Sequence, residues 1–139
     1  MSDWSNLLEK AKKLSYDEIV AEGKIIVDDV LASVAKHSDK DSAPIMLICL
    51  AAYTTNLDNN ISELEMQLMQ DVVGIREKDF RGFVNLFKDD KKLVRELKEI
   101  CLGMSKAETE KFAYMLALIF AVDGEISAKE SDFLNELFI

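Results

Sequence analysis

Residues 120–138 read FAVDGEISAKESDFLNELF, and this stretch combines the end of one helix, a tight turn and the start of another. Asp123 followed by Gly124 is typical of a turn, because glycine takes backbone conformations that other residues avoid. Ser127 and Glu130 have the spacing of a capping box, in which a serine hydroxyl and a glutamate carboxylate satisfy free backbone N–H groups at a helix start. The stretch therefore predicts two helices joined by a short loop.

The same pattern of helix, loop and capped helix occurs earlier in the chain. Residues 54–69 read TTNLDNNISELEMQLM, and aligning the chain on itself places residues 43–74 over 108–139. Such internal similarity indicates a repeated structural unit. The matching positions lie in the loop and the cap: Asp58 on Asp123, Ile61 on Ile126, Ser62 on Ser127 and Glu65 on Glu130. We therefore expect two pseudo-repeated helical hairpins.

The remaining sequence favours helices as well. Capping boxes are predicted at Ser15 with Glu18 and at Ser105 with Glu108, and apolar residues between the caps recur at helical spacing. Hydrophobic residues make up 49% of the chain, which is enough for one contiguous core. We predict an all-α fold in which residues 1–139 form a single compact bundle of about seven to eight helices. Helices are expected over about 43–57, 62–73, 105–122 and 127–138, and apolar positions at helical spacing mark four others within residues 4–14, 19–34, 80–87 and 93–101.

Charge is unevenly distributed along the chain. The formal net charge is −9, yet residues 76–111 contain 10 Lys/Arg against 8 Asp/Glu, so this segment carries +2 and the remainder −11. A strongly acidic surface repels phosphate backbones, which disfavours nucleic acid as a partner. The N-terminus lacks the basic and apolar regions of a secretory signal, and no apolar run approaches the length of a membrane span. We expect a cytoplasmic protein without a membrane span.

The repeated motif also resembles a known family. Residues 120–138 are similar to the ADG-x-(I/V)-(S/T)-x-x-E signature of the TerB-like domains of tellurite resistance, and residues 54–69 match it more loosely. The chain departs from that signature at three positions, where Val122 replaces the usual Ala, Ala128 a frequent Pro, and Asn59 the Gly of the first loop. The first loop is therefore the less regular of the two.

The resemblance implies an intracellular helical domain associated with tellurite resistance and stress response, and such a domain also stands at the front of a membrane-anchored DnaJ-type co-chaperone. It further implies an acidic surface, which in that family is proposed to bind metal ions. The positions of this chain that match the acidic residues of the motif are Asp58, Glu65, Asp123 and Glu130.

A comparison with calcium-binding loops limits this metal hypothesis. Asp123 and Glu130 coincide with positions 5 and 12 of an EF-hand loop, but positions 1 and 3 would be Ile119 and Ala121, which have no side-chain oxygen. A complete calcium cage in the second copy is thereby excluded. The first copy has a weak set of oxygen ligands, which are Thr54, Asn56, Asp58 and Glu65. Two interpretations stay open: both loops share a hard divalent cation such as calcium, or the motifs serve only as caps and turns.

Other chemistry-bearing residues give little sign of catalysis. The sequence contains no motif for nucleophilic, phosphate-loop or zinc-hydrolase chemistry. We expect His37 to be a solvated turn residue without a role, and Cys49 and Cys101 to be buried thiols. The aromatic row of Phe80, Phe83 and Phe87 suits a helix core better than a peptide groove.

These observations favour a non-enzymatic TerB-like module of a stress or tellurite-resistance system. It would bind a protein partner and hold a divalent cation through its acidic loops. The alternative is a purely structural helical interaction domain without a metal site.

Overall fold

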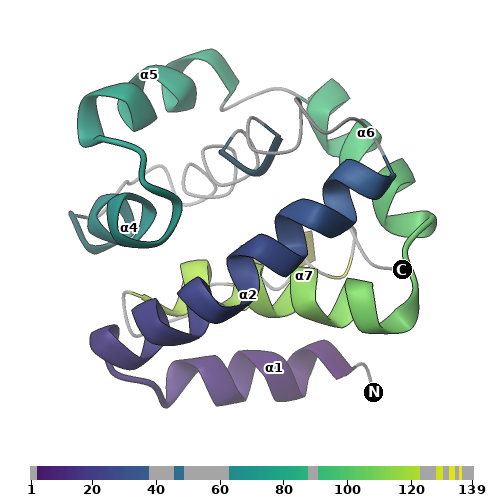
Figure 1. Ribbon diagram of the computed structural model, residues 1–139, viewed down its shortest axis with the longest axis horizontal. Coiled ribbons are helices and arrows are strands. Elements are labelled where there is room, and N and C mark those ends of the chain that lie inside the picture. Colours follow the sequence, from purple (N-terminus) through teal and green to yellow (C-terminus); the bar gives the residue numbers. More distant parts are fainter. Residues whose placement is uncertain are drawn as a thin grey trace.

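The computed structural model describes residues 3–37, 46–48, 63–87, 91–122, 128–129, 132–133 and 135. Every element within these ranges is helical, which confirms the predicted all-α class (Figure 1). The elements are α1 (Asp3–Lys12), α2 (Tyr16–Lys36), α4 (Glu63–Leu68), η1 (Met69–Val73), α5 (Glu77–Phe87), α6 (Lys91–Leu102) and α7 (Lys106–Ala121). Residues 46–48 form a further short helical piece between α2 and α4 in the chain.

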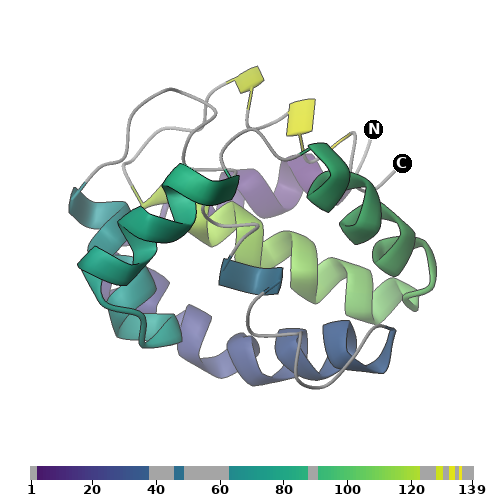
Figure 2. The same cartoon turned by 90° about the horizontal axis from the view of Figure 1, so that it is seen from above.

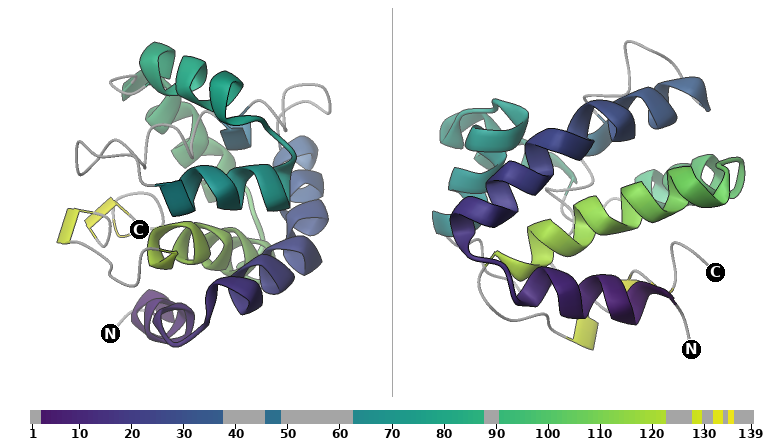
Figure 3. Two further views of the ribbon diagram at one scale, coloured as in Figure 1. Left: turned by 90° about the vertical axis from the view of Figure 1, so that its left-hand side faces the viewer. Right: turned by 60° about the horizontal axis from the view of Figure 1, so that its bottom comes forward.

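Helix α7 lies at the centre of the core because it is apolar on nearly every side. Residues 112–122 are all buried, so they lack the one-sided pattern of a surface helix. Both α1 and α2 pack against α7, and the right-hand view of Figure 3 shows α7 between them. In Figure 2, α2 runs beside α7 along one edge of the molecule. The long contacts of α1 and α2 with α7 therefore organise this part of the fold.

Two of the predicted capping boxes are present and begin the two longest helices that the structure describes. At the start of α2, the Glu18 N–H donates to Ser15 Oγ at 3.2 Å, and the Ser15 N–H donates to Glu18 Oε1 at 2.9 Å. Ser105 and Glu108 make the same pair of bonds at the start of α7, with the same two distances. These local patterns were sufficient to predict where both helices begin.

The helix predicted over 62–73 ends at Gly74 as expected, but its last turn is wider than an α-helix. Residues Met69–Val73 form the π-helical segment η1, and the Gly74 N–H donates to Met69 O at 3.0 Å and to Gln70 O at 3.1 Å. Gly74 has φ 86°, a left-handed conformation that glycine adopts without steric cost. The predicted end of the helix at Gly74 is therefore confirmed, whereas the π-helical geometry of its last turn was not predicted.

Two contacts with α2 fix η1 in place. The Tyr16 hydroxyl donates to Asp71 Oδ2 at 2.7 Å. Val72 packs over Gly23, where an added Cβ would lie only 3.0 Å from Val72 Cγ2. Gly23 thus allows the two helices to approach closely, and a side chain at this position would require Val72 to move away by a few tenths of an ångström.

The predicted helices over 43–57 and 127–138 lie mostly outside the described residues. Those of their residues that are described are helical, and Leu47 and Phe133 are buried. The relation between the pseudo-repeats 43–74 and 108–139 stays a prediction. Among the helices that the structure describes, none is long and apolar enough to cross a membrane.

Candidate functional site

Of the four residues predicted to bind a metal, Asp58, Asp123 and Glu130 lie outside the described residues. Glu65 lies in α4 and is buried, with an exposed fraction of 7%, and it interacts with other groups of the molecule. Within the part of the chain that the structure describes, no three His, Cys, Asp or Glu side chains are grouped so that they could hold a metal ion. The shared metal site stays a prediction about the two loops.

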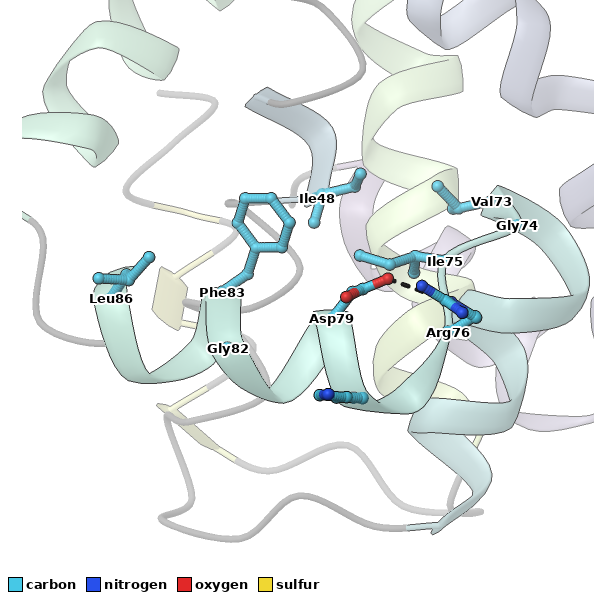
Figure 4. Close-up of a pocket in the computed structure, with 10 residues that line it drawn as sticks. Ile48, Val73, Gly74, Ile75, Arg76, Asp79, Gly82, Phe83 and Leu86 are labelled. Atoms are coloured by element: carbon cyan, nitrogen blue, oxygen red, sulfur yellow. Dashed lines mark hydrogen bonds and ion pairs between the residues drawn. The ribbon is translucent and has the colours of Figure 1, made fainter.

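An apolar cleft of about 560 Å³ lies between α5, the end of η1 and the short helical piece at residues 46–48. Ile48, Val73, Ile75 and Phe83 form its apolar walls, and Figure 4 shows the Phe83 ring pointing toward Ile48. The volume lies in the range of roughly 300–1,000 Å³ that is typical of ligand pockets. We refer to this feature as the α5 cleft.

Helix α5 contributes to the α5 cleft because it has apolar residues on two faces. Phe80 and Val84 are buried in the core, at a spacing of four residues. Gly82, Phe83 and Leu86 line the cleft instead, and Leu86 is 75% exposed. The expectation that the aromatic row belongs to the core is therefore confirmed for Phe80. Phe83 is partly buried against the core and also lines the cleft, and the side chain of Phe87 lies outside what the structure describes.

The charged residues of the α5 cleft lie where α5 begins. Arg76 Nε and Asp79 Oδ2 are 3.3 Å apart, and this ion pair is exposed to solvent. Lys78 also lines the cleft, so the lining carries two cations and one carboxylate. The cleft is thus locally basic in a chain whose formal net charge is −9.

His37 forms a second group of interest, and it is not the solvated residue that the sequence suggested. Its side chain is only 20% exposed, and Nε2 lies 3.4 Å from Glu108 Oε1. A carboxylate only accepts hydrogen bonds, so the ring must carry a hydrogen on Nε2 to make this one. The ring also lies against Gly103, where an added Cβ would be 3.1 Å from Nδ1. The turn after α2 is therefore packed onto the turn before α7.

Glu108 collects several interactions at this point. The backbone N–H of Ser105, together with His37, Ser33 and Lys36, lowers the pKa of Glu108 to about 2, while partial burial opposes the shift. Next to it lies a cavity of about 260 Å³, lined by Asp29, Ala32, Ser33, Lys36, Ala107, Glu108 and Lys111. This carboxylate thus connects the end of α2 to the start of α7.

The order of these groups does not suit nucleophilic catalysis. In a nucleophilic triad the histidine lies between the hydroxyl and the carboxylate, so that it can take the hydroxyl proton. Here Glu108 interacts with both Ser33 and His37, and it already accepts the Ser105 N–H at 2.9 Å. The arrangement is that of a helix cap with additional partners.

Sequence reasoning missed the α5 cleft and the contact between His37 and Glu108. The one local sign of the cleft was Gly82, a glycine in the middle of a predicted helix between Phe80 and Phe83. No such sign existed for His37, because Glu108 is distant in the sequence. The chain matches no protein-family model, no curated protein and no solved structure.

Proposed function

We propose that this chain is a non-enzymatic TerB-like module of a cytoplasmic stress or tellurite-resistance system, and that it binds a protein partner through the α5 cleft. The resemblance of residues 120–138 to the TerB-like signature motivates the setting, and the observation that carries the binding site is an apolar cleft that is open to solvent beside an exposed Leu86. Apolar side chains of a partner would gain from burial there, at roughly 25 cal/mol per Å². An exposed apolar surface with a charged rim is typical of protein interaction sites.

The acidic loops form the second half of the proposal. Carboxylates of Asp58, Glu65, Asp123 and Glu130 would hold a hard divalent cation such as calcium if the two repeated hairpins bring both loops together. In the alternative, these residues only cap helices and make turns. The two Ser-x-x-Glu pairs that the structure describes, at Ser15 and Ser105, both form capping boxes, which favours this alternative for the loops.

Site-specific crosslinking tests the interaction. A photo-crosslinking amino acid placed at Leu86 in the full chain, expressed in its natural host, should give an adduct with one defined protein. The same amino acid at Lys24, which is exposed on α2, is the control. The identified partner should then bind the purified wild-type chain at least about tenfold more tightly than the Leu86→Asp variant, which buries a charge at the contact. Identical adducts at both positions would contradict the proposal.

A complementation experiment tests the physiological setting. Deletion of the gene should reduce growth of the host on tellurite, and the wild-type chain should restore growth while Leu86→Asp should not. Unchanged growth of the deletion strain would contradict a role of the chain in tellurite resistance. The interaction site would then be tested by crosslinking alone.

Calorimetric titration tests the cation site. Calcium, magnesium, manganese and zinc are added in turn to the wild-type chain and to a variant carrying Asp58→Ala and Asp123→Ala. A cation that binds the wild type and not the variant would support a shared site. Absence of binding to the wild type, or equal binding to both, would favour the alternative in which the motifs only cap and turn.

A further inference from the structure

We infer that the α5 cleft is shaped for an amphipathic helix of the partner protein, which packs its apolar face over Gly82 and directs acidic residues toward Arg76 and Lys78. This inference rests on the proposed function, because it assumes that the cleft binds a protein. It adds the secondary structure and the charge of the segment that is bound.

Gly82 provides the first argument. A glycine within a helix lowers stability by about 0.5–1 kcal/mol relative to alanine, so its presence in the middle of α5 has a cost. Backbone conformation does not require a glycine at position 82, because its φ is not positive. Packing does not require one either, because the residue is exposed and an added Cβ would meet no atom of the described residues within 4 Å. The space above Gly82 belongs to the α5 cleft. A missing side chain there lets another backbone approach α5 closely.

The spacing of the cleft residues provides the second argument. Asp79, Gly82, Phe83 and Leu86 follow one another at i, i+3, i+4 and i+7, so they form one stripe along α5, as Figure 4 shows. This stripe spans about two helical turns, or roughly 10 Å. Helices pack at axial distances of about 8–10 Å, and small residues at the contact favour the shorter distances. An elongated stripe with a glycine inside it suits another helix.

The exposure of Leu86 argues against a small apolar ligand. This side chain is 75% exposed at the open end of the stripe. Small ligands normally bury most of their own surface in a closed pocket. A small molecule bound inside the cleft in this way would not extend over Leu86 and would leave much of its side chain in water. A helix that continues past the cleft would cover Leu86 as well.

Charge provides the third argument. Arg76 and Lys78 line the cleft, Asp79 neutralises one of these cations, and Lys78 forms no ion pair with any of the described residues. A helix with acidic residues beside its apolar face would find a complementary charge here. A basic helix would be drawn to the acidic remainder of the chain, which carries −11 outside residues 76–111.

A display selection tests the inference. A library of amphipathic helical peptides, in which the polar positions vary freely between acidic and basic residues, is selected against the full-length chain. We expect enrichment of peptides with acidic residues beside the apolar face. Failure to enrich any helical peptide, or enrichment of basic ones, would overturn the inference, as would saturable binding of dodecanoate in the cleft without any enriched peptide.

Variants of α5 locate the binding. Gly82→Leu fills the space over α5 with a good helix former, and it should weaken the best peptide at least about tenfold in fluorescence anisotropy. Asn85→Leu is the matched control, because it places the same side chain on an exposed position of α5 outside the cleft. It should leave the affinity within about twofold. Equal effects of the two variants would overturn the inference. Thermal unfolding of both confirms that each is folded.

A charge reversal tests the rim. Arg76→Glu with Lys78→Glu should shift the selected peptides from acidic to basic, whereas Lys24→Glu with Lys106→Glu changes the net charge equally at exposed positions elsewhere and should not. The same shift in both variants would assign the preference to net charge and overturn the inference.

If crosslinking at Leu86 captures a partner while no acidic helix is selected, this inference fails and the proposed function stands. If crosslinking captures none, the proposed function itself fails.

Discussion

Glu108 is the residue at which most of the described polar contacts between α2 and α7 meet. It accepts the Ser105 N–H as part of the capping box and lies 3.4 Å from His37 Nε2 and 4.0 Å from Lys36 Nζ. Glu18 makes the same capping box at the start of α2, without such additional partners among the residues that the structure describes. The two glutamates therefore allow the effect of a cap to be separated from the effect of the contact between helices.

The pKa of Glu108 predicts a loss of stability in acid. Its pKa falls from 4.5 to about 2 in the folded chain. A carboxyl whose folded pKa is depressed stabilises the fold above its unfolded pKa, and this contribution disappears as the pH falls from 4.5 toward 2. We expect the urea midpoint of the wild type to fall across this window, and to fall less in Glu108→Gln. Equal slopes for wild type and variant would contradict the prediction, and Glu18→Gln serves as the control for the cap alone.

Cys101 predicts a chemical property at the same scale. Burial in α6 raises the pKa of its thiol to about 12, well above the ordinary 9.0. Only the thiolate is nucleophilic, so alkylation by iodoacetamide at about pH 8 should be at least ~100-fold slower in the folded chain than in urea. Mass spectrometry of the peptide that contains Cys101 measures the two rates. A folded chain that reacts as fast as the unfolded one would show that the thiol is accessible.

At the scale of elements, the contact between α2 and η1 and the stripe on α5 depend on two glycines with opposite surroundings. A Cβ at Gly23 would lie 3.0 Å from Val72 Cγ2, while a Cβ at Gly82 would meet no described atom within 4 Å. Val72 is β-branched and therefore stiff, so it has little freedom to move away. The same substitution at the two positions should have opposite effects.

Alanine at these positions gives the third prediction. Gly82→Ala should stabilise the chain by about 0.5–1 kcal/mol, because it removes the conformational freedom of glycine from a helix. Gly23→Ala should destabilise it by about 1–3 kcal/mol, because the added methyl overpacks the contact with Val72. Urea unfolding of the two single variants measures both values. The double variant Gly23→Ala with Val72→Ala should recover most of the loss, and a lack of recovery would place the strain elsewhere.

Whether a feature of this structure could be predicted depends on how far apart along the sequence its interacting residues lie. The caps at Ser15 and Ser105 and the helix end at Gly74 depend on residues within one or two turns, and these features were predicted correctly. Residues Asp71 and Val72 of the π-helical turn η1 contact α2, and His37 contacts Glu108, so both features involve residues that are distant in the sequence. Local patterns contain no information about such partners, and the α5 cleft was missed for the same reason.

At the scale of the whole molecule, repulsion among the excess negative charges opposes folding. The core is held together mainly by apolar packing around α7. The chain carries −9, and the ion pairs that the structure describes are mostly exposed. Exposed ion pairs contribute only about 0–1 kcal/mol each. Repulsion among the excess carboxylates acts over longer distances, and salt screens it, since the Debye length shortens from about 30 Å at 0.01 M to about 3 Å at 1 M.

The fourth prediction separates this general screening from a specific cation site. The melting temperature of the wild type should rise with sodium chloride, because screening relieves repulsion more than it weakens the exposed ion pairs. The rise should shrink in a variant with Asp28→Lys and Glu99→Lys, two exposed positions that bring the net charge from −9 to −5. At equal ionic strength, calcium chloride should stabilise the wild type beyond sodium chloride only if the acidic loops bind the ion, since a ligand that binds only the folded state adds stability that rises with the logarithm of its concentration above the dissociation constant. That excess should vanish when Asp58→Ala is combined with Asp123→Ala, and an excess that persists in this variant would place the cation on another part of the chain.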